Sequence, residues 1–299
     1  MTMAAVMRRW ILVCGLAVAL AAAAACATTT SGAVGPPATA APVAPAATGG
    51  PVDVVVQGAV DSELQPLLAA LEDREEIQIA AWTFWRGRLG GKRVVVSRTE
   101  VGPINAVAAT TLAILNFKPR LIINQGTAGA ADPDLRVFDV VVGEATVDYG
   151  AFRSRHADAG EGVDLARWTP MFHRFRLAGT DQLALQHFPG DPDALKVALA
   201  TPHARGRVVK GIIGSAFEFN REIDRLAWVR QTYGAVSEDM ESAFSAGTAL
   251  GFVTPFLAIR IISDSEFYAP ELQRIAGQYC AEFVVEVVKR LPAGGTRER

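Results

Sequence analysis

The chain has few of the residues that build metal centres and disulfide frameworks. Its 299 residues include three cysteines and four histidines. No Cys/His cluster has the spacing of metal ligands, so we expect no metal site. Cys14 lies in an N-terminal apolar run and Cys26 directly after it, which leaves Cys280 alone in the rest of the chain. The composition therefore fits a protein without disulfides, and we expect Cys280 to pack as a small hydrophobe rather than to be reactive. The scattered histidines are His156, His173, His187 and His203.

The sequence also lacks a surplus of basic residues. Its 29 Lys and Arg residues face 31 Asp and Glu residues, for a formal net charge of -2. A protein that binds nucleic acid usually carries a clear excess of positive charge on one face. Because half of the residues are hydrophobic, the composition is that of an ordinary globular protein. We therefore expect no nucleic acid partner.

Charge is missing from a long N-terminal stretch, where no charged residue lies between Arg9 and Asp53. The apolar run 10–25 is short for a membrane span and is typical of an export signal. It ends in three alanines before Cys26, which resembles a bacterial lipobox. Residues 1–25 are thus predicted to be a lipoprotein signal peptide, with Cys26 as the lipidated mature N-terminus. Plain cleavage near Ala25 and an uncleaved anchor are the alternatives.

The segment that follows, residues 26–51, is rich in Ala, Pro and Thr and has no charged residue. Such a segment cannot build a core and is predicted to be a disordered tether. The three N-terminal features together predict an exported protein. It would be anchored to a membrane through the lipid on Cys26 and would face the periplasm or the cell exterior.

Residues 52–291 have the length of one domain, followed by a C-terminal tail at 292–299. Val/Ile-rich runs alternate here with helix-like segments, and such runs indicate a sheet that is covered on both faces. We therefore predict an α/β fold with three layers. The expected strands are 52–57, 93–97, 121–124, 137–142, 208–213 and 256–262. The expected helices are 63–71, 105–115, 240–250 and 272–288. Residues 144–176, polar but with several aromatics, are interpreted as an insertion, either a lid or a surface excursion.

One predicted strand contains and precedes polar and charged residues that are unusual for a buried strand. The apolar run 256–262 is interrupted by Arg260 and is followed by Ser263 and Asp264. A buried strand normally excludes unpaired charge because desolvation of an ion is costly. A carboxylate just past the carboxyl end of such a strand lies where open α/β sheets bind ligands. This placement suggests a site, together with the acidic segment 238–241 just upstream.

Three other predicted strands also end in polar or glycine-rich segments. Glu63 follows the first strand, where it is either functional or simply an acidic residue favoured by the helix dipole. Thr127 lies in the glycine-rich segment 124–129, where backbone N–H groups could approach a ligand. Phe217 ends the segment 214–217 and either packs in the core or stacks on a planar ligand.

These motifs carry a resemblance to a known family. The segments 124–129, 140–144, 214–217, 238–241 and 262–264 occur in the order and rough spacing of the purine and uridine phosphorylase superfamily. Within it they look most like methylthioadenosine/S-adenosylhomocysteine nucleosidases. The resemblance runs from about residue 54 to 288 and implies a three-layer αβα fold with a mixed central sheet. It also implies a purine nucleosidase that needs no cofactor and forms a homodimer.

The resemblance implies roles for the residues that catalyse the reaction. Asp264 matches the acid that protonates N7 of the departing purine, and Glu63 matches the base that activates water. Thr127 takes the place of a serine that positions this water together with an arginine, which Arg260 matches.

The substrate-binding residues follow from the same resemblance. Glu241 matches the carboxylate that holds the ribose hydroxyls, and Met240 packs under the sugar. Phe217 matches the ring that stacks on the base, and the backbone at Glu218 matches the group that reads the purine edge. Ser263, from the Ser-Asp signature, completes this set.

These assigned roles leave open the nucleophile and the 5′ substituent of the substrate. Phosphorylases of the superfamily carry an arginine in the first loop and another just before the Gly-Ser turn. Here the first loop has Asp61 and Glu63, and Gln125 precedes Gly126. A phosphate dianion would find no guanidinium fork there, so the sequence favours water. A phosphorylase that recruits Arg98 or Arg153, and a weakly active nucleoside-binding lipoprotein, remain alternatives. Because residues 148–152 depart from the family pattern, the 5′ substituent stays open.

Overall fold

The computed structural model describes residues 50–292. The predicted signal peptide, Cys26 and all but the last residues of the predicted tether lie outside the described residues, as does the tail from residue 293. None of the described helices has the length and apolar character needed to cross a membrane.

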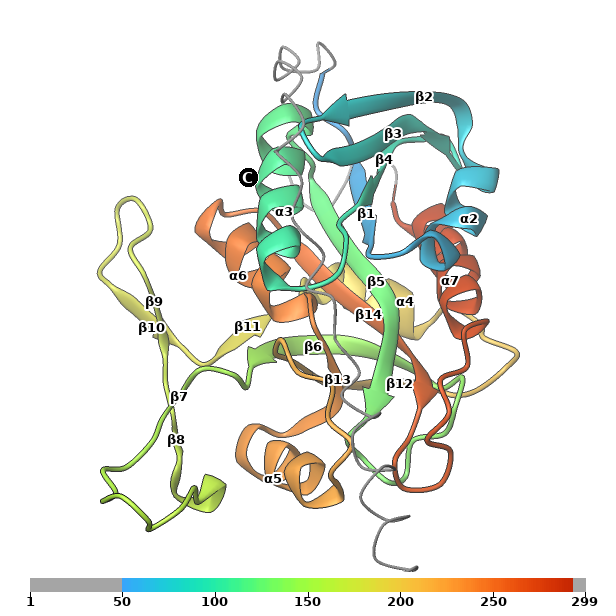
Figure 1. Cartoon of the computed structure of the whole chain (residues 1–299). Helices are drawn as coiled ribbons and strands as arrows, with labels where there is room; N and C mark the ends of the chain where they lie inside the picture. Colours follow the sequence, from blue (N-terminus) through green and yellow to red (C-terminus); the bar gives the residue numbers. More distant parts are fainter. Residues whose placement is uncertain (1–49, 293–299) are drawn as a thin grey trace, which may run out of the picture. The chain divides into compact units, whose positions relative to one another are not determined.

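Within residues 50–292, ten strands form one mixed sheet, and two further pairs of short strands lie apart from it (Figure 1). The strands are β1 (Val54–Gly58), β2 (Glu72–Ile79), β3 (Trp82–Leu89), β4 (Lys92–Arg98), β5 (Leu121–Ala130), β6 (Val140–Asp148), β7 (Phe152–Arg153), β8 (Thr169–Pro170), β9 (His173–Phe175), β10 (Leu183–Leu185), β11 (His187–Pro189), β12 (Val208–Ser215), β13 (Ala235–Asp239) and β14 (Phe256–Asp264). The helices are α2 (Asp61–Ala70), α3 (Pro103–Phe117), α4 (Pro192–Leu199), α5 (Ile223–Tyr233), α6 (Ser242–Gly251) and α7 (Ala276–Arg290), with a 3-10 turn at Leu165–Arg167.

The sheet partly closes on itself. Its strand order is β11-β6-β12-β13-β5-β1-β4-β3-β2, and β14 pairs with both β5 and β6. The strands β5, β14, β6, β12 and β13 therefore form a closed ring of pairings. Parallel pairs such as β1 with β5 and β5 with β14 are joined by antiparallel pairs such as β13 with β5. The predicted mixed sheet is confirmed, while its closure was not foreseen.

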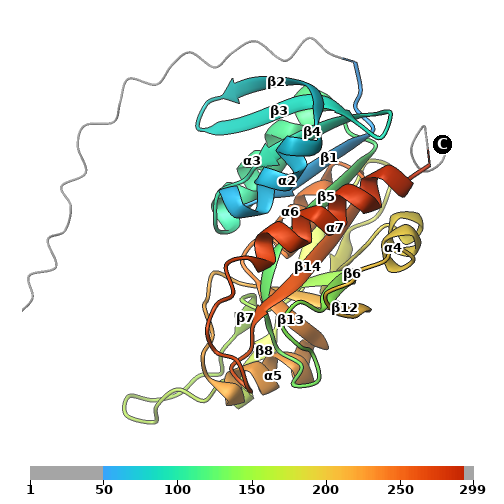
Figure 2. The same ribbon diagram turned by 90° about the vertical axis from the view of Figure 1, so that its right-hand side faces the viewer.

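Helices cover both faces of the sheet, as predicted. On one face, Val54 and Val56 of β1 share a core with α2 and α7. On the other face, Val55 shares a second core with α3 and α6. Neighbouring residues of β1 enter different cores because successive side chains of a strand point to opposite faces of the sheet. Figure 2 shows α7 and α2 side by side along one face.

Several sequence predictions about the elements were wrong in detail. The glycine-rich segment 126–129 is not a turn, because β5 continues through it and pairs with β14 up to Gly129. Asp264 is the last residue of β14 rather than the residue after it. The hairpin β2–β3, strand β13 and helices α4 and α5 were missed.

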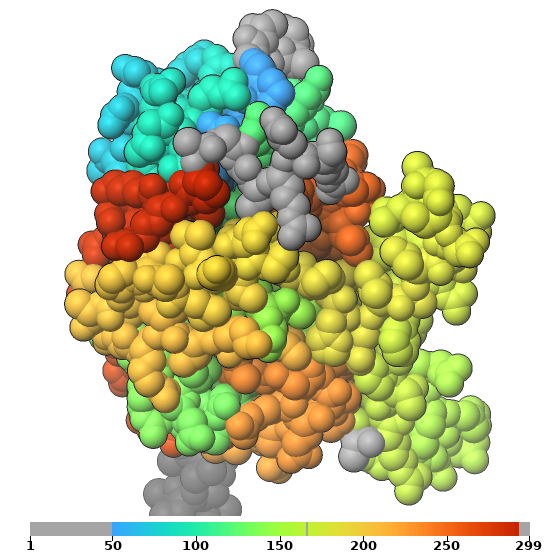
Figure 3. All heavy atoms as spheres, turned by 180° about the vertical axis from the view of Figure 1, so that it is seen from behind, coloured from blue at the N-terminus to red at the C-terminus, as the bar shows by residue number. Residues whose placement is uncertain are grey.

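The expected insertion 144–176 is shorter than predicted at its start, because β6 runs to Asp148. The following segment forms the β7–β8 pair and then the β9–β10 hairpin. Residues of this segment project beside the body of the sheet (Figures 1 and 3). It thus adds surface at one end of β6.

Candidate active site

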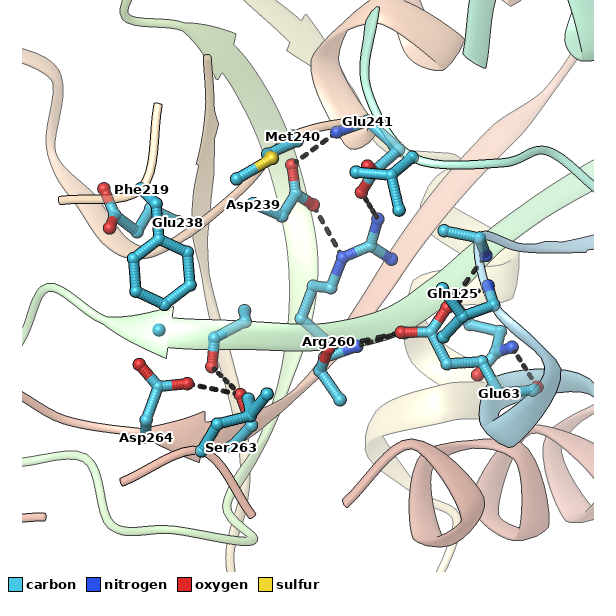
Figure 4. A pocket seen from close by; sticks show the side chains of 18 of the residues that line it. Glu63, Gln125, Phe219, Glu238, Asp239, Met240, Glu241, Arg260, Ser263 and Asp264 are labelled. Carbon is cyan, nitrogen blue, oxygen red and sulfur yellow. Dashed lines mark hydrogen bonds and ion pairs between the residues drawn. The ribbon is translucent and has the colours of Figure 1, made fainter. Parts of the chain in front are cut away.

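A cavity of about 390 Å³ lies where the carboxyl ends of β1, β4, β5, β13 and β14 meet. This is the place at which open α/β sheets bind ligands. The predicted residues Glu63, Thr127, Arg260 and Asp264 all line it. So do the predicted substrate-binding residues Met240, Glu241, Glu218 and Ser263. Figure 4 shows Glu63 and Asp264 on opposite sides of this cavity.

Glu63 is held by four hydrogen bonds at the start of α2. Its Oε2 accepts from the backbone N–H groups of Ala59, at 2.8 Å, and Val60, at 3.3 Å. Its Oε1 accepts from the N–H of Thr127, at 2.9 Å, and from the hydroxyl of Thr127, at 3.2 Å. The side chain therefore stabilises the first turn of the helix, as the simpler interpretation proposed. It also links β1 to β5 inside the cavity.

Gly126 leaves room for the carboxyl group of Glu63, and Gln125 holds its backbone. A Cβ atom at residue 126 would lie 2.6 Å from Oε1 of Glu63, so any side chain there would displace the carboxyl group. Gln125 donates from Nε2 to the backbone carbonyl of Glu63 at 2.7 Å. The glycine thus permits close approach rather than a turn, and Gln125 fixes the loop before α2.

Arg260 is the buried charge whose partner the sequence did not reveal. Its Nε lies 2.6 Å from Oδ2 of Asp239, and both side chains are almost fully buried. Its Nη2 donates to Oδ1 of Asn124 at 2.5 Å and lies 3.9 Å from Oε2 of Glu241. Asp239 also accepts hydrogen bonds from the hydroxyl groups of Ser215 and Ser242. These contacts compensate the desolvation of both ions.

Glu241 is the N-cap residue of α6, and its side chain lies at the N-terminus of α3. Its Oε1 accepts from the N–H of Gly102, which caps that helix, at 2.9 Å. Burial raises the pKa of Glu241 to about 7, and the nearby Asp239 adds to the shift, whereas Arg260 and the Gly102 N–H oppose it. Met240 lies beside it on the cavity wall (Figure 4).

Asp264 reaches the cavity through an irregularity in β14. The register with β5 shifts between Ile262 and Asp264, so Ser263 is the extra residue. Such a bulge re-aims the side chain that follows it. The hydroxyl of Ser263 donates to Oδ1 of Asp264 at 2.6 Å. Burial raises the pKa of Asp264 despite this hydrogen bond, which is the property required of a carboxylic acid that donates a proton.

Another acidic residue, Glu238, belongs to the segment 238–241, but the sequence analysis gave it no role of its own. It lines the cavity on the side of Asp264, and its Oε2 accepts from Tyr149 at 2.9 Å and from Asn220 at 2.6 Å. Burial raises the pKa of Glu238 to about 7, against the effect of the Asn220 and Tyr149 hydrogen bonds. Tyr149 lies 89 positions away along the chain, so no sequence signal joins the two.

Two phenylalanines follow β12, and the one that the sequence analysis assigned to the base, Phe217, is not the one that lines the cavity. Phe217 is 72% exposed and is not among the described residues that line the cavity. Its ring lies close to Gly102, where an added Cβ would come within 2.9 Å of it. Phe219 lines the cavity instead, near Glu238 and Asp264 (Figure 4). Glu218 also lines it and pairs with the buried Arg225 at 2.9 Å.

The family follows from the sequence comparisons. A model of the phosphorylase superfamily matches residues 53–289. The chain belongs to the phosphorylase superfamily. Among curated superfamily members, a 5′-methylthioadenosine/S-adenosylhomocysteine nucleosidase of Staphylococcus haemolyticus is 32% identical over 209 residues, which cover 69% of this chain and 84% of that protein. The corresponding nucleosidase of Tolumonas auensis is 29% identical and covers 78% of this chain and 97% of that one.

Solved structures of the phosphorylase superfamily share the fold. The nucleosidase of Neisseria meningitidis in complex with methylthio-immucillin-A superposes with a TM-score of 0.65 at 26% identity, covering 80% of this chain and 99% of that one. A futalosine hydrolase of Helicobacter pylori has a TM-score of 0.64 at 20% identity, with coverage of 80% and 98%. These matches confirm the predicted fold class.

Proposed function

We propose that the domain hydrolyses the N-glycosidic bond of a purine nucleoside of the methylthioadenosine or S-adenosylhomocysteine type. The products are the free base and a ribose derivative. The observation that carries this proposal is the placement of Glu63 and Asp264 on opposite sides of one cavity, with Glu241 beside Met240 on a third part of its wall (Figure 4). An acid for the leaving base and a base for water are the two groups that such hydrolysis requires.

The geometry suits a division of roles. Adenine leaves poorly as an anion, so Asp264, whose pKa is raised, would protonate N7. Positive charge develops on the ribose during cleavage, and Glu241 would stabilise it and hold the hydroxyl groups. Glu63 would take a proton from water near the Thr127 hydroxyl. Arg260, together with Thr127, would position this water.

The charges of the cavity favour water over phosphate. Among the described residues, its lining includes six carboxyl groups but only two arginines, Arg260 and Arg274. The carboxyl groups are those of Glu63, Glu218, Glu238, Asp239, Glu241 and Asp264. Arg260 is already paired with Asp239. Arg98, one arginine that a phosphorylase could recruit, is paired with Asp61 at 3.0 Å and Glu100 at 2.8 Å. A phosphate dianion would therefore meet net negative charge.

A base-release assay tests this function directly. Purified protein is incubated with methylthioadenosine, S-adenosylhomocysteine, adenosine and inosine in phosphate-free buffer, and the free base is measured. We expect release without phosphate and no stimulation when phosphate is added. Release that depends on phosphate would identify a phosphorylase. Tight nucleoside binding without release would identify a binding protein.

We also propose that the domain forms a homodimer through the apolar surface at the mouth of the cavity. Val101 and Phe219 line the cavity, Phe217 lies close to Gly102, and Ile104 follows in the first turn of α3. All four side chains are exposed, Ile104 to 83%. Their association would bury apolar area that a monomer leaves in water. Sedimentation equilibrium should give twice the monomer mass, and Ile104→Asp should return the protein to a monomer.

A further inference from the structure

Glu238 is a buried carboxyl group that the mechanism above does not use. It lies in β13 and is 9% exposed, and it lines the cavity beside Asp264. A carboxyl group in such a place is costly unless its oxygens have partners. Its contacts therefore indicate what it could bind.

One oxygen of Glu238 is fixed by the protein. Tyr149 and Asn220 both donate to Oε2, at 2.9 Å and 2.6 Å, and Asn220 also donates to the Tyr149 hydroxyl at 3.0 Å. The Tyr149 ring is fully buried, and the guanidinium carbon of Arg225 lies 5.6 Å from its centroid. This packing leaves the carboxyl group little freedom to rotate.

The other oxygen faces the same space as Asp264. A Cβ atom at residue 129 would lie 3.7 Å from Oε1 of Glu238 and 3.5 Å from Oδ2 of Asp264. Asp264 is arranged in the same way, because its Oδ1 is bonded to Ser263. Each carboxyl group thus has one oxygen held by the protein and directs the other to the space beside Gly129. A ligand there would contact both.

We propose that Glu238 reads position 6 of the purine and selects a 6-amino base over a 6-oxo base. This inference rests on the proposed function, in which Asp264 binds N7. The substituent at position 6 is the neighbour of N7 on the side away from the sugar. Glu238 and Asp264 lie away from Glu63 in Figure 4, so the second carboxyl group is placed for this substituent. A carboxylate oxygen accepts a hydrogen bond from an amino group but repels a carbonyl oxygen.

The protonation state of Glu238 gives the selectivity a pH dependence. Burial raises its pKa to about 7, so it loses its proton near neutrality. The ionised form only accepts hydrogen bonds, whereas the protonated form can donate one to a 6-oxo group. Selectivity for the 6-amino base should therefore rise between pH 6 and pH 8. The charged or titratable groups around Glu238 are Tyr149, Glu218, Arg225, Asp239 and Asp264.

The variant Glu238→Gln tests the proposal, because it should shift the preference from a 6-amino base toward a 6-oxo base. Tyr149 and Asn220 are donors to Oε2, so the amide oxygen of Gln should take that place. The amide NH2 would then face the cavity and would favour a 6-oxo base. We expect the ratio of kcat/KM for adenosine to that for inosine to fall at least about tenfold, the scale of one hydrogen bond to a charged group. Glu144→Gln, which alters a surface pair with Lys210, is the matched control and should leave the ratio unchanged.

Affinities for free adenine and hypoxanthine, measured by calorimetry, keep this test independent of catalysis. If no nucleoside is cleaved, the proposed function fails, but the wild-type protein should still prefer adenine and Glu238→Gln should lose that preference. Cleavage with an unchanged ratio in a folded variant would overturn the role of Glu238. If thermal melting shows that the variant is unfolded, the wild-type ratio between pH 6 and pH 8 decides, and a flat profile overturns the proposal.

Discussion

Arg260 and Asp239 form an ion pair inside the protein, with Nε of Arg260 2.6 Å from Oδ2 of Asp239 and side chains that are 2% and 1% exposed. The pair joins β14 to the end of β13, next to the residues that would bind ribose. A buried pair adds little net stability compared with apolar residues, but loss of one partner leaves the other charge uncompensated. The geometry of the cavity therefore depends on Asp239.

We expect Asp239→Ala to lower the free energy of unfolding by about 3 to 5 kcal/mol, because it leaves Arg260 buried without its nearest counter-ion. Urea denaturation measures this change. Glu75→Gln removes the exposed ion pair with Arg86 and is the matched control, for which we expect a change within about 1 kcal/mol. Equal losses of unfolding free energy in the two variants would show that the buried pair contributes no more to stability than the exposed one.

Asp264→Asn should lower turnover at least about a hundredfold, the usual scale for a lost general acid. Substrate binding should change much less, because the amide keeps the shape of the carboxyl group. Single-turnover kinetics with methylthioadenosine would separate the two quantities. Ser263→Ala removes the hydrogen bond to Oδ1 but keeps the acid, so its effect should be smaller. Turnover near the wild-type value in Asp264→Asn would remove this residue from the mechanism.

Glu63→Gln and Glu241→Gln should fail in different ways. If Glu63 activates water, its variant should bind nucleoside but hardly cleave it. If Glu241 holds the ribose hydroxyls, its variant should lose affinity for nucleosides but keep affinity for the free base. Calorimetric titration of each variant with a nucleoside and with adenine measures these affinities. Equal loss of free-base binding in both variants would contradict the assignments.

Much of the site could be predicted because its residues lie at strand ends or interrupt an apolar run. Arg260 in an apolar run and Asp264 after it are local signals, and both line the cavity. The partners of these residues could not be predicted, because pairing between distant segments leaves no local trace. Tyr149 and Glu238, for example, meet only because β6 and β13 both pair with β12. The closure of the sheet through β14 and β6 escaped prediction for the same reason.

The continuation of β5 shows a different limit. Glycines at 126 and 129 are typical of a turn, but both lie within the strand, and Gly126 instead allows the carboxyl group of Glu63 to approach the strand closely. Sequence alone does not separate these two uses of glycine. Phe217 and Phe219 illustrate a third limit, since two phenylalanines one residue apart offer the same chemistry. Only the path of the loop places Phe219 in the cavity lining.

The raised pKa of Glu238 predicts how stability changes with pH. Its pKa rises from 4.5 to about 7 on folding, so the folded state binds the proton more tightly. The associated stability is present below pH 4.5 and is lost as pH rises through 7. Glu238→Gln should thus gain stability relative to wild type between pH 4.5 and pH 8, by on the order of 3 kcal/mol. Urea denaturation of both proteins at pH 4.5 and at pH 8 measures this gain. The same difference in unfolding free energy between the two proteins at both pH values would contradict it.

The last prediction concerns the N-terminal region outside the described residues. We propose that Cys26 is lipidated and that the tether lets the domain face the periplasm or the cell exterior. One acyl chain binds a membrane only marginally, whereas two or more hold stably, so a multiply acylated Cys26 would keep the protein on the membrane. Cys26→Ser should release soluble protein or leave an uncleaved precursor, as shown by fractionation and N-terminal mass spectrometry. If the wild-type protein is soluble and begins at Ala27 or later, lipidation is excluded, although export would stand.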